Sequence, residues 1–291
     1  MINDIFAVIA PVFISAGLGF IWARAGQDFP VQTISSLTML IGTPCLIFHT
    51  LVNIDLDLRQ VVIMAGGALM ALSIFAALGL IVLKLTGLSL RGYLPCLMFP
   101  NTGNMGLPLG FFAFGAEGLA LALSFFVVNS IGQFTVGDSI AAGSVSVRRL
   151  VRTPVLYAVA AGLFFMVSGV KSPVWLNNTT QLLGGMAIPL MLIALGNSLA
   201  RLKLTGAGRV LGLAVFRLGM GFAVGWGLAE ILGLEGAARG VLIMQSSMPA
   251  AVFNYMFAQH YATEPDDVAG MVILSTAIGF AGLPFLLWFV L

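Results

Sequence analysis

The stretch Pro100–Leu109, which reads Pro-Asn-Thr-Gly-Asn-Met-Gly-Leu-Pro-Leu, constrains the fold more than any other part of the chain. It lies within Gly92–Ala116, a run without charged residues that is long enough to cross a bilayer. Prolines inside a helix remove backbone hydrogen bonds, and in hydrocarbon the freed groups cannot turn to water. We therefore expect a broken helix here. It is either a kink healed by neighbouring helices or, as in many transporters, part of a binding site.

The composition indicates an integral membrane protein. Of the 291 residues, 59% are hydrophobic and 8% are charged, whereas soluble domains are about 25% charged. The net charge of +2, without a Lys/Arg run, predicts no nucleic-acid partner. Cys45 and Cys96 both fall within apolar runs, so we interpret them as small core residues rather than as a disulfide.

Runs of about 20 apolar residues predict ten membrane-spanning helices. Their approximate bounds are Ile5–Ala23, Thr33–Val52, Val61–Leu83, Gly92–Ala116, Gly118–Gly137, Pro154–Val170, Val174–Leu199, Val210–Ala229, Gly240–Tyr261 and Val268–Leu291. A polar connector, Asp138–Arg152, separates the first five spans from the last five. The expected units are therefore a first repeat at 1–137, a cytoplasmic connector at 138–153 and a second repeat at 154–291.

Basic residues at the span ends predict the orientation in the plasma (inner) membrane, because Lys and Arg accumulate in cytoplasmic loops. With the N-terminus outside, nine basic residues fall in inner loops and three in outer loops. The inner set is Arg24, Lys84, Arg91, Arg148, Arg149, Arg152, Arg201, Lys203 and Arg209, and the outer set is Arg59, Lys171 and Arg239. We therefore expect both termini on the non-cytoplasmic side.

An odd number of spans in each half places the two halves in opposite orientations, as in the inverted repeats of secondary transporters. The second and seventh spans both carry a proline, Pro44 and Pro189, at the same place in each half. The fourth span carries Pro100–Leu109. The ninth carries Gln245–Asn254, which reads Gln-Ser-Ser-Met-Pro-Ala-Ala-Val-Phe-Asn. In both halves the order is the same: a span kinked by proline, a long span, a broken span and a span with polar residues near its middle. This recurring order predicts two inverted five-helix repeats.

The two broken spans form a candidate site for an anion. We expect each to contain a second half-helix whose N-terminus points into the protein, with Pro108 and Pro249 in the first turns. Asn104, Ser246 and Ser247 lie just upstream, where we expect their side chains to cap free amides. Helix N-termini carry partial positive charge and free N–H donors, which favours an anionic ligand. Alternatively, the polar groups only satisfy the broken backbone. The candidate substrate-binding residues are Asn101, Asn104, Pro108, Asn129, Arg217, Gln245, Ser246, Ser247, Pro249 and Asn254.

Two titratable residues inside the predicted spans have more than one interpretation. Arg217 lies about 12 Å along a helix from Arg209, near the middle of the hydrocarbon, where an arginine is costly and is either functional or firmly paired. It could add positive potential for an anion, or it could bind carbonyls at the C-terminal end of a broken half-helix. His49 could sense pH or touch substrate, or it could be a hydrogen-bonded contact between helices.

Enzymatic chemistry and simple proton antiport are disfavoured by the residues of the spans. No Asp or Glu falls deep inside a predicted span, no Gly-x-Ser-x-Gly motif occurs, and the only two histidines give no metal-ligand spacing. We expect no cofactor and no catalytic site. Sodium coupling stays open, because the side-chain oxygens of four residues could coordinate the ion: Asn129, Gln133, Ser275 and Thr276.

With ten spans in two sets of five and with these motifs in the fourth and ninth, the chain resembles the auxin efflux carrier family. That family includes plant PIN carriers and bacterial carriers described as malonate or dicarboxylate transporters, and the short connector resembles bacterial members. The resemblance implies an all-α fold shared with bile-acid symporters and sodium/proton antiporters, in which the fourth and ninth spans cross at Pro108 and Pro249 or at neighbouring residues. It also implies a scaffold of spans 1, 2, 6 and 7, a transport domain of spans 3, 4, 5, 8, 9 and 10 that moves as an elevator, and a homodimer built through the scaffold.

These observations predict a secondary carrier for a small organic anion, either an auxin-like monocarboxylate or a malonate-like dicarboxylate, that works by alternating access. The carboxylate would sit on the half-helix N-termini near Asn104–Pro108 and Ser246–Pro249. The alternative within transport is a sodium-coupled organic-anion symporter of the bile-acid type. A channel is disfavoured because no predicted span carries a polar stripe along its whole length. A membrane enzyme is disfavoured by the missing nucleophile, and a signalling receptor by the missing soluble domain.

Overall fold

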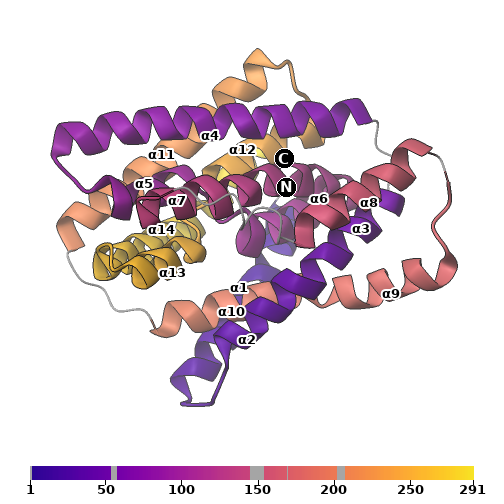
Figure 1. Cartoon of the computed structure of the whole chain (residues 1–291), viewed down its shortest axis with the longest axis horizontal. Helices are drawn as coiled ribbons and strands as arrows, with labels where there is room; N and C mark the ends of the chain where they lie inside the picture. Colours follow the sequence, from indigo (N-terminus) through magenta and orange to yellow (C-terminus); the bar gives the residue numbers. More distant parts are fainter. Residues whose placement is uncertain (1, 54–57, 145–153, 169, 202–206) are drawn as a thin grey trace.

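The computed structural model describes residues 2–53, 58–144, 154–168, 170–201 and 207–291. These ranges are built almost entirely of helices, which cross one another at the centre of the molecule (Figure 1). The elements are α1 (Ile2–Arg24), α2 (Val31–Leu37), η1 (Thr38–Gly42), α3 (Thr43–Asn53), α4 (Leu58–Thr86), α5 (Leu90–Met98), η2 (Thr102–Gly106), α6 (Leu107–Gly132), η3 (Gln133–Gly137), α7 (Asp138–Ala142), α8 (Pro154–Ser168), α9 (Val174–Gly185), α10 (Ala187–Arg201), α11 (Ala207–Ile231), α12 (Gly236–Ser247), α13 (Val252–Tyr261) and α14 (Pro265–Val290). The three η elements are π-helical turns that continue into α-helices.

Six apolar helical stretches of the described chain are long enough to cross a membrane, which makes this a multi-pass membrane protein as predicted. They are Phe6–Arg24, Leu58–Thr86, Thr102–Ala142, Val174–Ala200, Gly208–Ile231 and Pro265–Val290. The other predicted spans contain shorter or interrupted helices, so the arrangement of ten spans in two inverted repeats stays a prediction. Most of the connector, with three of the basic residues used for orientation, lies outside the described residues, as does Lys203.

The longest apolar stretch, Thr102–Ala142, folds back on itself at Gly115. The backbone there has φ 65° and ψ −148°, a conformation that residues other than glycine rarely adopt. After the turn, the chain returns along its own first arm: a Cβ added at Gly110 would lie 2.9 Å from the Cβ of Ala122 and 3.1 Å from the carbonyl oxygen of Gly118. α6 therefore contributes two antiparallel arms. The first is the last part of the predicted fourth span, and the second lies within the predicted fifth span.

Both spans that were predicted to be broken are broken. The first break lies between Met98, the last residue of α5, and Thr102, the first residue of η2. The second lies between Ser247, the last residue of α12, and Val252, the first residue of α13. Each break contains a proline, which supplies no N–H to a helix and so favours an interruption.

The helices pack in two groups. In the first group, α1 packs against α10, and α3 packs against η1, α8 and α9. In the second group, α4, α5, α6, α11, α12 and α14 pack among themselves, and α13 packs against α14. The first group holds predicted spans 1, 2, 6 and 7, and the second holds spans 3, 4, 5, 8, 9 and 10. The expected division into a scaffold and a transport domain stays a prediction.

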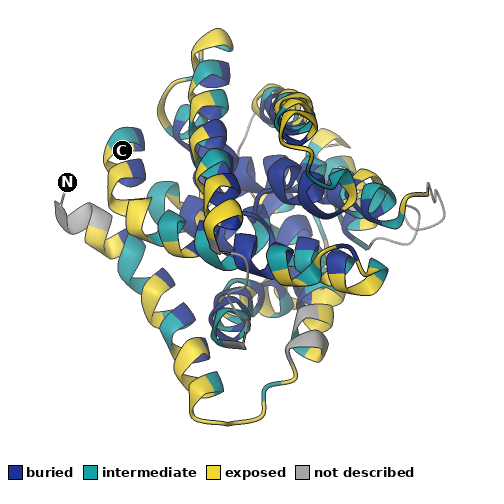
Figure 2. Ribbon diagram, turned by 90° about the vertical axis from the view of Figure 1, so that its left-hand side faces the viewer, coloured by how far each residue is buried: buried dark blue, intermediate teal, exposed yellow. Residues whose placement is uncertain are grey.

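Apolar side chains cover the outer helix faces, whereas the buried residues gather at the centre (Figure 2). Along α1, the side chains of Phe6, Ile14, Leu18 and Ile21 are all exposed. Such faces suit contact with lipid tails, because backbone polar groups of a helix are satisfied internally. By contrast, Gly240–Ser247 at the end of α12 are all buried. The broken helices therefore lie in the interior of the protein.

Candidate functional site

The two breaks pair with each other at the centre of the fold. Pro100 and Ala250 form an isolated antiparallel β-bridge. Its hydrogen bonds run from the N–H of Asn101 to the carbonyl of Pro249 (2.7 Å) and from the N–H of Ala251 to the carbonyl of Phe99 (3.1 Å). Because backbone groups in a membrane interior need protein partners, each broken helix supplies the partners that the other lacks.

Polar side chains complete the hydrogen bonding of this crossing. Asn129 donates from Nδ2 to the carbonyl of Pro100 (3.3 Å) and to Oγ1 of Thr102 (2.9 Å). The remaining bonds run from Asn254 Nδ2 to the Phe99 carbonyl (3.2 Å), from Gln133 Nε2 to Asn254 Oδ1 (3.0 Å) and from the Ala250 N–H to Ser275 Oγ (3.2 Å). Asn129 and Asn254 thus satisfy broken backbone, which is the structural alternative weighed from the sequence.

The crossing runs through Pro100 rather than Pro108, and the half-helix caps differ from those expected. The first half-helix begins at Thr102, so Pro108 lies one π-helical turn further on, in the first turn of α6. Its N-cap residue is Asn101, and that of α13 is Ala251, neither with a side-chain cap bond. The expectation of side-chain caps was therefore wrong for three residues: Asn104 lies inside η2, and Ser246 and Ser247 end α12.

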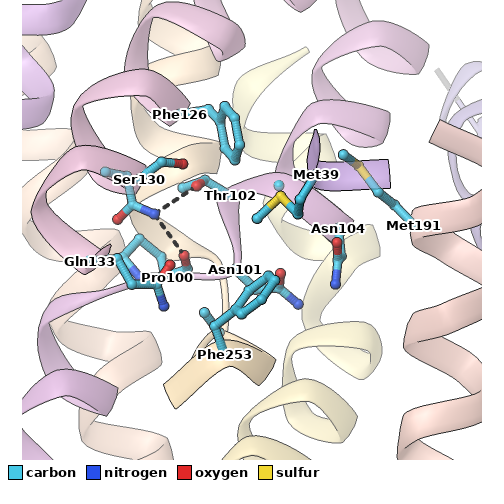
Figure 3. A pocket seen from close by; sticks show the side chains of 13 residues that line it. Met39, Pro100, Asn101, Thr102, Asn104, Phe126, Ser130, Gln133, Met191 and Phe253 are labelled. Carbon is cyan, nitrogen blue, oxygen red and sulfur yellow. Dashed lines mark hydrogen bonds between the residues drawn. The ribbon is translucent and has the colours of Figure 1, made fainter. Parts of the chain in front are cut away.

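A small pocket, partly open to the outside, lies beside the crossing (Figure 3). Its lining residues are Met39, Pro100, Asn101, Thr102, Gly103, Asn104, Phe126, Asn129, Ser130, Gln133, Met191, Ala251 and Phe253. None of these described residues is acidic or basic. An adjoining hollow shares Met39, Asn104, Met191 and Phe253 with the pocket, so the two form one cleft.

The cleft lies where the two packing groups meet. Met39 of η1 and Met191 of α10 come from the first group, whereas Asn104 of η2 and Phe253 of α13 come from the broken helices. The lining combines amides and hydroxyls with apolar side chains (Figure 3). Such a combination suits a small organic molecule with one polar end.

Two amide atoms in the pocket lining are buried without a hydrogen-bond partner among the described residues. They are Nδ2 of Asn101, a donor, and Oδ1 of Asn129, an acceptor. Buried polar atoms without partners are costly. Next to them, the first turn of a helix leaves N–H groups without intrahelical partners. The Thr102 N–H donates to the Pro100 carbonyl at 2.8 Å, so Gly103 and Asn104 are the residues that bring such N–H groups of η2 to the pocket. The pocket can therefore offer several hydrogen-bond donors to a ligand.

The predicted site residues divide between the pocket and its surroundings. Asn101, Asn104 and Asn129 line the pocket. The lining does not include Pro108, Arg217, Gln245, Ser246, Ser247, Pro249 and Asn254. Of the candidate sodium ligands, Asn129 and Gln133 line the pocket, whereas Ser275 accepts the Ala250 N–H and the buried Thr276 hydroxyl has no partner among the described residues.

Arg217 is fully buried on α11, away from the pocket lining. Its Nη2 donates to the carbonyl of Ser246 (3.0 Å), at the C-terminal end of α12. Its guanidinium carbon lies 4.5 Å from the ring centroid of Phe75. This geometry matches the interpretation in which Arg217 binds a carbonyl at the end of a broken half-helix.

His49 lies at a contact within the first packing group, outside the pocket lining. Its Nδ1 lies 2.9 Å from Oδ1 of Asn177, and Asn53 joins the same cluster with bonds to both residues. The cluster connects α3 to α9. His49 is therefore placed as the hydrogen-bonded helix contact that was one of its two interpretations. Within the described ranges, no group of three His, Cys, Asp or Glu residues could hold a metal ion.

Sequence comparison identifies the family. The membrane transport protein family matches residues 4–144 and 138–288, which is nearly the whole chain. The chain belongs to this family, the auxin efflux carriers. The chain is similar to an "uncharacterized transporter" of Methanothermobacter thermautotrophicus, which is 26% identical over 96% of this chain and 96% of its own. An "uncharacterized transporter" of Methanocaldococcus jannaschii is 26% identical over 72% of this chain and 71% of its own. The protein is therefore a membrane transporter, and the apolar helices agree with that.

Several residues of this membrane transport protein's cleft were missed from the sequence. They are Met39, Thr102, Gly103, Phe126, Ser130, Met191, Ala251 and Phe253. A signal existed for two of them, since Met39 and Met191 lie near the paired prolines Pro44 and Pro189 of the second and seventh spans. The apolar lining residues carry no motif, because a methionine or phenylalanine in a membrane span is ordinary.

Proposed function

We propose that this transporter carries a small organic anion, with the carboxylate bound at the first turn of η2 beside Asn101 and Asn104. The Nδ2 of Asn101 carries the proposal, because it is a buried donor without a partner among the described residues and belongs to a residue that lines the pocket. A carboxylate accepts such bonds, and the partial positive charge of a helix N-terminus favours it. No lining side chain is acidic, so none repels an anion.

The apolar side chains of the lining define the rest of the substrate. Met39, Phe126, Met191 and Phe253 line the pocket together with the polar residues (Figure 3). A second carboxylate would lose its hydration against these side chains, which is costly without a partner. The lining therefore favours a monocarboxylate with an apolar body, of the auxin-like kind, over a malonate-like dicarboxylate.

The position of the cleft supports alternating access by an elevator movement. The pocket lies where the first packing group meets the second, so sliding of one group along the other would carry the site across the membrane. The proposal includes ten spans in two inverted repeats, both termini on the non-cytoplasmic side, and a homodimer built through the first group, whose exposed apolar faces are available for it.

The test is uptake of labelled carboxylates into proteoliposomes that contain the purified full chain, in sodium-free buffer and again with sodium. We expect saturable uptake or counterflow of at least one monocarboxylate without sodium. Asn104→Ala and Pro249→Ala should each lower uptake about tenfold, the effect of losing one good hydrogen bond or its positioning, while the protein stays folded in detergent. Asn178→Ala, at an exposed position on α9, is the matched control.

Each result decides between the candidates. Uptake only in the presence of sodium would favour the sodium-coupled symporter of the bile-acid type. Wild-type uptake in both Asn104→Ala and Pro249→Ala would remove the site assignment. A folded protein that moves none of the carboxylates under either condition would contradict the proposed function.

A further inference from the structure

A buried positive charge sits at the end of one broken half-helix, where the proposed function does not require it. The guanidinium of Arg217 is fully buried and donates from Nη2 to the Ser246 carbonyl at 3.0 Å. A helix leaves its last carbonyls without intrahelical partners, and they carry partial negative charge. The end of α12 would therefore attract a cation if Arg217 were absent.

The surroundings hold the guanidinium without neutralising it. The face of the Phe75 ring lies 4.5 Å from the guanidinium carbon, a cation–π contact. Nε and Nη1 have no hydrogen-bond partner among the described residues, and no described carboxylate forms an ion pair with Arg217. An unpaired buried charge is costly. If the only role of this side chain were to donate a hydrogen bond to the end of α12, a neutral donor would do so at a lower free-energy cost. The charge itself is the feature that needs an explanation.

Carriers built from broken helices commonly bind sodium at this kind of place, where half-helix C-terminal ends and unwound carbonyls coordinate the ion. The end of α12 does not fit a sodium ion, because the guanidinium already occupies the Ser246 carbonyl. A Cβ added at Gly221 would come within 3.0 Å of Nη1, so that side of the group is closely packed as well. Ser246 is three residues before Pro249 in the sequence. The carbonyl of Pro249 accepts the hydrogen bond from the Asn101 N–H at the crossing.

We propose that Arg217 is a built-in cation that takes the place of a coupling sodium ion at the crossing, so that transport proceeds without sodium. The inference rests on the proposed function for its transport readout. It assigns to Arg217 a positioning role: the fixed charge holds the end of α12, and through it the crossing, in the arrangement that a bound cation would otherwise create.

The test compares wild type with Arg217→Ala, Arg217→Gln and Arg217→Lys in proteoliposomes. Carboxylate uptake by the wild type should be equal in sodium and choline buffers. The Ala and Gln variants should lose about tenfold or more, as expected when a charged hydrogen bond is removed, and guanidinium or sodium ions should restore a large part of the uptake. The Lys variant should keep partial uptake that is independent of sodium. Arg24→Ala, at the exposed end of α1, should respond to neither ion.

Three results would overturn the inference: wild-type uptake that requires sodium, variants that transport fully in sodium-free buffer, or folded variants that neither ion rescues. The thermal unfolding midpoint in detergent gives a second readout that needs no substrate. Sodium should raise the midpoint of Arg217→Ala and leave that of the wild type unchanged, and equal responses would contradict the inference. If no anion is transported, the proposed function fails, and this second readout still decides the role of Arg217.

Discussion

Pro100 and Ala250 pair as an antiparallel β-bridge although they belong to helices in opposite halves of the chain. The N–H of Asn101 donates to the carbonyl of Pro249 at 2.7 Å, a bond that neither helix could make alone. In a membrane interior, no water is present to form hydrogen bonds with these backbone N–H and carbonyl groups. The two broken helices therefore stabilise each other, and the crossing behaves as one structural unit.

Asn129→Ala should destabilise this unit. The Asn129 amide donates to the Pro100 carbonyl and to the Thr102 hydroxyl, and both acceptors are buried. Leaving such groups without a partner costs about 1–3 kcal/mol, so the unfolding midpoint in detergent should fall by several degrees. Asn178→Ala, an exposed change of the same kind on α9, should leave the midpoint unchanged. Equal midpoints for both variants would show that water or lipid replaces the lost bonds.

Gly19→Ala should loosen the contact of α1 with α10. A Cβ at Gly19 would overlap the backbone carbonyl of Ile193, and backbone cannot move aside as a flexible side chain can. Overpacking of this kind costs about 1–3 kcal/mol. Gly17→Ala, two residues earlier on the same helix, meets nothing within 4 Å and serves as the control. Unfolding midpoints in detergent test this contact. If α1 packs against α10 as described, the midpoint should fall for Gly19→Ala and stay unchanged for Gly17→Ala.

The breaks could be predicted from the sequence because their signal is local. Prolines and amides within an apolar run have few explanations in hydrocarbon other than interrupted backbone that is satisfied by protein. The same locality limits the prediction. Both Pro100 and Pro108 are able to start or interrupt a helix, and the choice of Pro100 depends on its pairing with Ala250, which no local pattern reveals.

The site could be predicted only in part for a similar reason. Asn101 and Asn104 stand out in sequence because polar residues are rare in membrane spans. Met39 and Met191 do not, since they reach the cleft through the packing of distant helices. Arg217 was recognised as unusual, yet its partner is a backbone carbonyl, and a carbonyl has no side-chain signature.

Asp267→Asn should weaken the end of the second packing group at which α5, α11 and α14 meet. Its carboxylate accepts a hydrogen bond from the Tyr93 hydroxyl and pairs with Arg209, so one residue connects three helices. The amide keeps the shape but loses the charge and half of the acceptor capacity. The unfolding midpoint should fall for Asp267→Asn and stay unchanged for Asp266→Asn, its exposed neighbour. High salt should narrow the difference only slightly, because the Tyr93 bond is partly buried.

Cross-linking the two packing groups across the cleft should arrest transport. Met39 of η1 and Phe253 of α13 line the same cleft from opposite groups. Cysteines at both positions, with Cys45 and Cys96 replaced by alanine, can be joined by a bifunctional thiosulfonate reagent and released by reductant. If the groups must slide past each other, joining them should abolish uptake, and reduction should restore it.

The matched control joins two residues of the first group. His49 and Asn177 already touch, with 2.9 Å between Nδ1 and Oδ1, and they lie outside the pocket lining. Cysteines at these positions, in the same cysteine-free background, should cross-link without loss of uptake, because both helices would move together. Full uptake in the cross-linked Met39–Phe253 protein would mean that the groups do not move relative to each other. Loss of uptake in both pairs would mean that the reagent, rather than restricted motion, stops transport.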